Sequence, residues 1–359
     1  MKRRPTGVRN AKYTRGSQSA ARGELENSVE SVLSQGKQLF TLPGARRPQV
    51  LQFEKIINFE ASKNRDETVA YKKADKAKNE ITDGIHDVRE MLEQRNTILE
   101  DLIGSGSYAE VYRGRITDIN RLVAVKIIDL NKVNIHYRTN FLPREISLIR
   151  KLHHPSIVKI FTISQVNFKV VIVMEYASNG TLSDRIAQTG AFTEVFALFF
   201  FRKVFDALFY MHNMSMAHRD LKLENILINN KNLPKLADFS FTVQFDGHTL
   251  CTDFCGSLPY FAPELLENKP YNPLASDVWS LGICLFIATN DRFPFNLNLK
   301  EKQILDLQKK RQFKFRPKTD NIFTDCYKDI VRKMMEPEVS LRIIMENAIK
   351  HDWFYCEIR

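Results

Sequence analysis

Five short motifs in a fixed order, spread between residues 104 and 264, constrain this chain more than any other feature. The densest motif occupies residues 218–225 (His-Arg-Asp-Leu-Lys-Leu-Glu-Asn). A glycine-rich segment and a lysine within an apolar run precede it, and the tripeptides Asp-Phe-Ser (238–240) and Ala-Pro-Glu (262–264) follow it. Segments so far apart act together only if the fold brings them to one place. The order therefore predicts one composite site built from distant parts of the chain.

Length and composition favour a globular chain with more than one core. The 359 residues are 43% hydrophobic and 26% charged, an ordinary globular composition. Chains longer than roughly 250–300 residues tend to divide into several cores. The longest plain apolar run, residues 195–201, is too short for a membrane span, which needs about 20 apolar residues. The basic N-terminus lacks a following apolar segment, so we do not expect a secretory signal.

The cysteines form no recognisable framework. There are five, and none belongs to a CxxC pair: Cys251, Cys255, Cys284, Cys326 and Cys356. An odd number without a framework favours a reducing interior. Cys251 and Cys255 have no matching His or Cys pair, so we interpret them as small packing residues rather than metal ligands.

Residues 1–96 are interpreted as a basic extension, largely disordered or linker. They carry 19 Lys/Arg against 13 Asp/Glu, so six of the eleven net positive charges lie there. Residues 1–23 hold seven basic and no acidic residues, which favours a solvated tail. The alternative is contact with an acidic protein, anionic lipid or RNA. Nucleic acid is disfavoured because Tyr13 is the only aromatic residue in this tail. Apolar groups at 25–33 and 50–57 either dock on a partner or the rest of the chain, or are only transiently ordered.

From residue 97 the pattern predicts strands first and helices afterwards. Residues 97–103, 122–128 and 170–174 are apolar and β-branched, as buried strands are. After residue 182 the spacing becomes helical, and residues 195–211 fit one long helix with a broad buried face. We expect an α+β fold with two lobes: a small β-rich N-lobe (97–175) and a larger helical C-lobe (178–354).

Lys126 needs a partner, because burying an unpaired ammonium inside an apolar strand is costly. Upstream, Gly104 and Gly106 allow the backbone to turn and to approach a ligand closely, although a glycine pair alone is a weak signal.

Together these motifs resemble those of protein kinases, over residues 97–354. The resemblance implies ATP and Mg²⁺ as cofactors and protein Ser/Thr hydroxyls as substrates. It implies catalytic roles for Asp220, Lys222, Lys126 and Glu145, and Mg²⁺ ligation by Asn225 and Asp238. It implies that Glu145 is the partner of Lys126. It also implies a buried ion pair between Glu264 and Arg342. It also implies nucleotide contacts from Ile103, Gly104, Ser105, Gly106, Ser107, Tyr108, Ala109, Val111, Ala124, Lys126, Met174, Glu175 and Ala177.

Three stretches, at 106–109, 141–145 and 254–257, resemble the testis-specific serine/threonine kinases, close to the calcium/calmodulin-dependent and AMP-activated kinases. This implies a cytoplasmic enzyme, with nuclear access left open, that acts in male germ cells. The position of that family's activating phosphothreonine holds Asp253 here, and Thr252 beside it is the candidate for a displaced phosphorylation site. We expect the Asp253 carboxylate to pair with Arg219 and to support activity without phosphorylation. The alternative is a solvated loop charge.

Two positions depart from the kinase pattern: Ala109 and Ser240 stand where glycine is usual. Ser240 predicts a stiffer hinge next to Asp238. These departures support an alternative function, a pseudokinase scaffold that binds partners without efficient phosphotransfer. The residues that phosphotransfer needs are all present, which argues against that alternative: Lys126, Asp220, Asn225 and Asp238.

Overall fold

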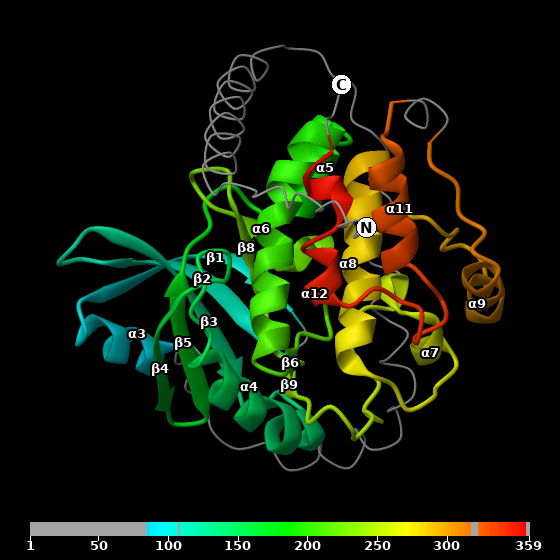
Figure 1. The fold of residues 1–359 in the computed structure, drawn as a ribbon. Helices are drawn as coiled ribbons and strands as arrows, with labels where there is room; N and C mark the ends of the chain where they lie inside the picture. The colour runs from blue at the N-terminus through cyan, green and yellow to red at the C-terminus, as the bar shows by residue number, and fades with distance from the viewer. Residues whose placement is uncertain (1–84, 107, 317–321, 357–359) are drawn as a thin grey trace, which may run out of the picture. The chain divides into compact units, whose positions relative to one another are not determined.

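The computed structural model describes residues 85–106, 108–316 and 322–356, all within the compact unit Lys76–Arg359. The N-terminal part of this unit is a five-stranded antiparallel sheet with the order β1-β2-β3-β5-β4 (Figure 1). Its central strand β3 is apolar and largely buried. The strands are β1 (Thr97–Ser105), β2 (Glu110–Ile116), β3 (Arg121–Asp129), β4 (Ile160–Val166) and β5 (Lys169–Glu175).

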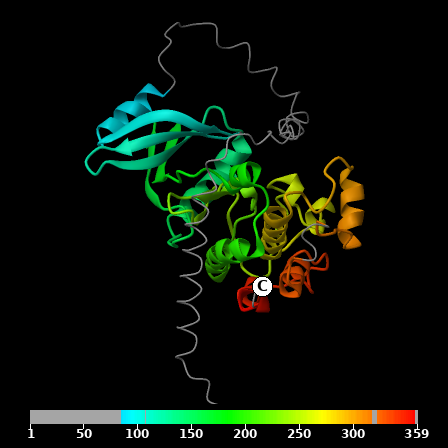
Figure 2. The same ribbon diagram turned by 90° about the horizontal axis from the view of Figure 1, so that it is seen from above.

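A short helix, α3 (His86–Glu93), packs on one face of this sheet (Figure 2). Val88 and Leu92 are fully or almost fully buried against Val123 and Val125 of β3. These contacts form a small second core, separate from the main one. The ordered body thus begins before residue 97, and residues 86–93 of the expected disordered extension belong to it. Residues 1–84 of that extension lie outside the described residues.

The opposite face of the sheet meets helix α4 (Leu142–Ile149). Successive strand residues point to opposite faces. Lys126 lies between Val125 and Ile127, which belong to the core under α3, so its side chain points away from α3 and reaches Glu145 of α4. A π-helical segment, η3 (Tyr137–Phe141), leads directly into α4. Pro143 lacks a backbone N–H, which accounts for the widened turn before it.

The C-terminal part of the unit is helical and contains most of the main hydrophobic core. Helices α6 and α8 lie side by side at its centre (Figure 1). Side-chain oxygens of Thr193 and Asn272 cap their N-termini. The helices are α5 (Leu182–Thr189), α6 (Glu194–Asn213), α7 (Pro263–Leu266), α8 (Pro273–Asn290), α9 (Glu301–Lys309), α11 (Asp325–Met334) and α12 (Met345–Ala348).

Short strands and 3-10 turns occur in the segments between α6 and α7 and after α12. Strand β6 pairs with β9, and β7 pairs with β8. Their bounds are β6 (Met216–Ala217), β7 (Ile226–Ile228), β8 (Pro234–Leu236) and β9 (Val243–Gln244), and the 3-10 turns are η4 (Leu223–Asn225), η5 (Leu258–Tyr260) and η6 (Asp352–Phe354). Within the described ranges, no helix combines the length and apolar character of a membrane span.

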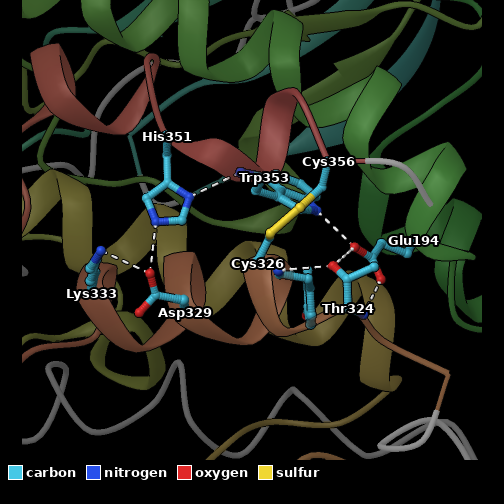
Figure 3. Close-up of a disulfide and its surroundings, with 9 residues drawn as sticks. Glu194, Thr324, Cys326, Asp329, Lys333, His351, Trp353 and Cys356 are labelled. Carbon is cyan, nitrogen blue, oxygen red and sulfur yellow. Dashed lines mark hydrogen bonds and ion pairs between the residues drawn. A yellow bond between two sulfur atoms is a disulfide. The ribbon is translucent and has the colours of Figure 1, made fainter.

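A disulfide joins α11 to the C-terminal segment through Cys326 and Cys356 (Figure 3). Beside it, Glu194 accepts hydrogen bonds from the Thr324 backbone and hydroxyl and from the Trp353 indole. The sequence had favoured reduced cysteines, and the structure differs at this pair. The two residues are 30 positions apart and share no motif, so only the folded arrangement brings them together.

Candidate active site

Lys126 stands at the centre of a polar group that joins the sheet, helix α4 and the segment after β8. Its Nζ lies 2.8 Å from Glu145 Oε1 and 3.2 Å from Asp238 Oδ1. The Lys126 and Glu145 side chains are only 11% and 2% exposed, so the ion pair is well shielded. The expected pairing of Lys126 with Glu145 is therefore present.

Electrostatics keeps these groups charged. Burial alone lowers the pKa of Lys126, but the charges of Asp238 and Glu145 outweigh it and raise the pKa above its ordinary value. Burial raises the pKa of Asp238, yet the Lys126 charge and a hydrogen bond from Ser240 bring it well below its ordinary range. Each partner thus stabilises the charged form of the other.

A second polar group surrounds Asp220, which is 5% exposed. Lys222 Nζ lies 2.9 Å from Asp220 Oδ2, and the Ser257 hydroxyl donates to Asp220 Oδ1 at 2.9 Å. Lys222 also donates to the Ser257 hydroxyl, which closes a ring of three side chains. The Asn225 amide nitrogen donates to both the carbonyl and the carboxylate of Asp220, which orients its amide oxygen away from them.

Helix α8 holds the loop that carries Asp220. Asp277 accepts hydrogen bonds from the backbone N–H groups of His218 and Arg219, at 2.7 and 2.8 Å. His218 is fully buried and its Nε2 contacts the Ala237 carbonyl, which agrees with a structural rather than a basic role. Gly256 packs so closely that a Cβ would lie 2.5 Å from the Arg219 carbonyl, and its φ is +103°. A side chain is therefore excluded at Gly256.

The sheet register aligns several residues expected to contact nucleotide. Gly104 pairs with Val111, which in turn pairs with Lys126, and Ala124 pairs with Met174. The turn between β1 and β2 closes through a bond from the Gly106 N–H to the Ala109 carbonyl. The flanking residues Ile103 and Ser105 are exposed. Glu175 at the end of β5 and Ala177 just beyond it are half-buried, and Ser107 lies outside the described residues.

Tyr108, at the tip of this turn, stacks on Tyr137 of η3 with ring centroids 4.3 Å apart. It also meets Phe241 edge to face. Tyr137 in turn donates its hydroxyl to Glu145 Oε2 at 3.0 Å. The β1–β2 turn is thereby connected to the same helix that carries Glu145.

Asp253 does not pair with Arg219 as expected. Arg219 directs its guanidinium to the backbone carbonyls of Phe241 and Asp253 and to the Tyr271 hydroxyl. The Asp253 carboxylate instead lies 3.9 Å from Arg144 of α4. The reason is orientation: the Asp253 main chain faces Arg219, so its side chain points toward α4. Thr252 is exposed.

Three polar residues of the site were not identified from the sequence as parts of it. Ser257 was noted only as a sequence marker, although its hydroxyl bridges Asp220 and Lys222. Tyr137 lay outside every motif, and Arg144 lay in the stretch 141–145, which was interpreted only as a family marker. The roles of both residues depend on how η3 and α4 pack. The only signal that the sequence offers for these two residues is their closeness to Glu145: Tyr137 precedes it by eight residues and Arg144 by one.

A five-stranded sheet with a Lys–Glu pair, followed by a helical part with an Asp–Lys–Asn loop, is the arrangement of a protein kinase. Residues 98–354 match the protein kinase domain family. The chain belongs to this family and is a protein serine/threonine kinase.

The chain is similar to several testis-specific kinases. It is 36% identical to mouse testis-specific serine/threonine-protein kinase 1 over 275 residues, which cover 75% of this chain and 74% of that protein. The human protein of the same name is 35% identical over the same shares. Mouse testis-specific serine/threonine-protein kinase 3 is 34% identical over 70% of this chain and 93% of its own length.

Proposed function

We propose that this chain transfers the γ-phosphoryl group of Mg-ATP to Ser or Thr hydroxyls of protein substrates. The observation that carries the proposal is the meeting of residues 112 positions apart, Lys126 and Asp238, at 3.2 Å, with Glu145 on the same ammonium. Phosphoryl transfer needs little covalent chemistry from the protein and depends on positioned charges. The side chains of this site supply charges of both signs on rigid elements.

Each role follows from chemistry and position. Asp220 orients the substrate hydroxyl and accepts its proton, because it is the carboxylate of the loop held by Asp277. Lys222 stabilises the charge on the transferred group. Lys126, kept in place by Glu145, binds the nucleotide phosphates. Ala124, Val111 and Met174 supply the apolar surface for the base.

The residues present fit a magnesium ion. Mg²⁺ prefers hard oxygen ligands, and Asp238 and Asn225 offer a carboxylate and an amide oxygen. Asp238 is 41% exposed despite its bond to Lys126, so it is accessible. When bound, the metal neutralises phosphate charge. The protein's own part is to hold the two oxygen donors, Asn225 through its bonds to Asp220.

We further propose that the enzyme is active without activation-loop phosphorylation. Asp253 supports this through Arg144 rather than Arg219, because Arg144 directly precedes Glu145 on α4. The pair is long and both side chains are more than a third exposed, so its contribution is small, about 0.2–1 kcal/mol. Asp253→Ala should therefore lower activity of the bacterially produced enzyme only a few-fold. Activity equal to the parent would remove this role for Asp253.

The cellular role follows from the relatives' names and from charge. The names of the similar kinases favour an enzyme of male germ cells. We propose cytoplasmic location with nuclear access, and a protein partner of acidic character for the basic residues 1–96. Glu224 belongs to the same loop as Asp220, and we propose that its carboxylate favours basic residues in substrates.

Phosphotransfer from Mg-ATP to a panel of Ser/Thr peptides tests the main proposal, with Asp220→Asn as the matched inactive variant. We expect incorporation by the parent and a loss of at least about 100-fold in the variant, the range that general acid–base catalysis contributes. Equal incorporation by both would mean that the activity comes from a contaminant. Nucleotide binding without incorporation would favour the pseudokinase alternative, for which Ser240 and Ala109 are the supporting departures.

A further inference from the structure

Ser240 contributes a hydroxyl to the charged group around Lys126. Its Oγ donates to Asp238 Oδ1 at 2.6 Å and accepts from Lys126 Nζ at 2.9 Å. The residue is only 6% exposed. Its φ is not positive, whereas that of Asp238 is +58°. Glycine's conformational freedom is thus not required at residue 240, and what serine adds here is a buried hydroxyl.

This hydroxyl accepts the remaining hydrogen bond that the Lys126 ammonium can donate. A lysine ammonium has three N–H donors, and Lys126 has three hydrogen-bond partners: Glu145, Ser240 and Asp238, at 2.8, 2.9 and 3.2 Å. A nucleotide phosphate that binds Lys126 must displace one of them. The Glu145 bond is shielded and short, and the Asp238 carboxylate carries a full charge. The neutral Ser240 hydroxyl is therefore the partner that is lost at the lowest cost.

The Ser240 hydroxyl also competes with a metal cation for the carboxylate of Asp238. Asp238 Oδ1 accepts from both Ser240 and Lys126, so its lone pairs are engaged. A cation that takes this oxygen as ligand has to displace at least one of these two hydrogen bonds, and the bond from the neutral Ser240 hydroxyl costs less to lose than that from the Lys126 ammonium. With glycine at position 240, neither competition would exist.

We propose that the Ser240 hydroxyl is a displaceable partner of both Lys126 and Asp238, and that it weakens the binding of nucleotide and metal. This inference rests on the proposed nucleotide site. It makes Ser240 a positioning residue, since it acts through Lys126 and Asp238. Removing the hydroxyl leaves one Lys126 donor unsatisfied until a phosphate arrives, and it removes one of the two hydrogen bonds that a cation at Asp238 Oδ1 must compete with.

Calorimetric titration with ADP, with and without Mg²⁺, tests this inference on the full chain. We expect Ser240→Ala to tighten ADP binding about three- to tenfold, the equivalent of one hydrogen bond. The gain should be larger with Mg²⁺, because two hydrogen bonds are then displaced in the parent and only one without the metal. Ser240→Gly is the second variant and should shift the affinity in the same direction.

Thr242→Val is the matched control. Thr242 lies two residues further along the same segment, is 1% exposed, and its hydroxyl has no hydrogen-bond partner within the described part of the chain. This nearly isosteric change removes a buried hydroxyl that contacts neither Lys126 nor Asp238. We expect its ADP affinity to equal that of the parent.

Unchanged or weaker ADP binding by folded Ser240→Ala and Ser240→Gly would overturn the inference, as would an equal gain in Thr242→Val. Such a result would leave the proposed function intact if the parent phosphorylates peptides. Tighter binding by the variants of a parent that transfers no phosphate would support the inference and overturn the function. A parent that binds no ADP would overturn both.

Discussion

Two ion pairs of the C-terminal half show how burial determines the contribution of an ion pair to stability. Arg342 meets Glu264 through two parallel bonds of 2.7 and 3.0 Å, and the two side chains are 0% and 9% exposed. Lys350 meets Glu346 at 3.0 Å with both side chains more than 60% exposed. A bidentate buried pair leaves an uncompensated charge when one partner is removed.

We therefore expect Arg342→Met to lower the free energy of unfolding by about 3–5 kcal/mol. Its guanidinium also bonds the carbonyls of Ala275 and Glu336, which would lose their donors. Lys350→Met, the matched exposed control, should cost no more than about 0.5 kcal/mol. Urea denaturation followed by circular dichroism measures both. Similar losses in the two variants would contradict the assignment of the stability to burial.

The resemblance to kinases, together with residue identities, predicted two ion pairs correctly. The Glu264–Arg342 pair is confirmed, and so is the contact between Lys126 and Glu145. The expected Asp253–Arg219 ion pair is wrong, because the direction of an activation-segment side chain depends on how the segment crosses α4. The bridging role of the Ser240 hydroxyl could not be predicted either, because the sequence showed only that a usual glycine was absent.

At the scale of elements, α3 is an addition to the matched kinase domain, which begins at residue 98. It covers the outer face of β3 and β5 with Val88 and Leu92. Leu92→Ala should cost about 2–5 kcal/mol, because it leaves a cavity under a small core. Glu93→Ala, one residue along and exposed, is the control and should change little. Thermal unfolding measures both, and an unaffected Leu92→Ala protein would mean that α3 contributes nothing to the N-lobe.

The disulfide between α11 and the C-terminal segment gives a second prediction at the scale of elements. Closing a 30-residue separation by a disulfide stabilises the fold by about 2–4 kcal/mol, chiefly through the unfolded chain. We expect a reductant to lower the unfolding temperature of the parent and to leave that of Cys326→Ser unchanged. Cys284→Ser should respond to reductant as the parent does, because Cys284 is a free, buried thiol. A parent insensitive to reductant would contradict the link.

Element boundaries could be predicted where the apolar pattern was long. The expected strands at 97–103, 122–128 and 170–174 correspond to β1, β3 and β5, each extended by one or two residues at one or both ends. Helix α3 was missed because only Val88 and Leu92 of its eight residues are buried, too few for a periodic signal beside charged neighbours. The disulfide carried no local signal.

At the scale of the whole described molecule, the site lies where the N-terminal sheet meets the helical C-terminal part. Lys126 comes from the sheet, whereas Asp238 comes from the segment that follows β8. Aromatic contacts follow the same route: Tyr108 of the β1–β2 turn meets Phe241, and Phe141 of η3 meets Phe241 at 5.5 Å. Nucleotide affinity should therefore report on how well the two parts hold together.

This arrangement predicts a flat pH dependence for nucleotide affinity. The pKa of Lys126 is raised above 10.5, so its charge is present below that value and is lost only as pH rises through the raised pKa. The pKa of Asp238 is lowered below 3.8, so its charge is lost only as pH falls through the lowered pKa. Both charges persist across the neutral range. The Kd of ADP, measured by calorimetry, should stay constant between about pH 7 and about pH 9, the interval between the ordinary pKa values of His and Lys. An alkaline loss of affinity with a midpoint within that interval would show that Lys126 is not held by two carboxylates, and Lys126→Met, which cannot titrate, identifies any loss that arises elsewhere.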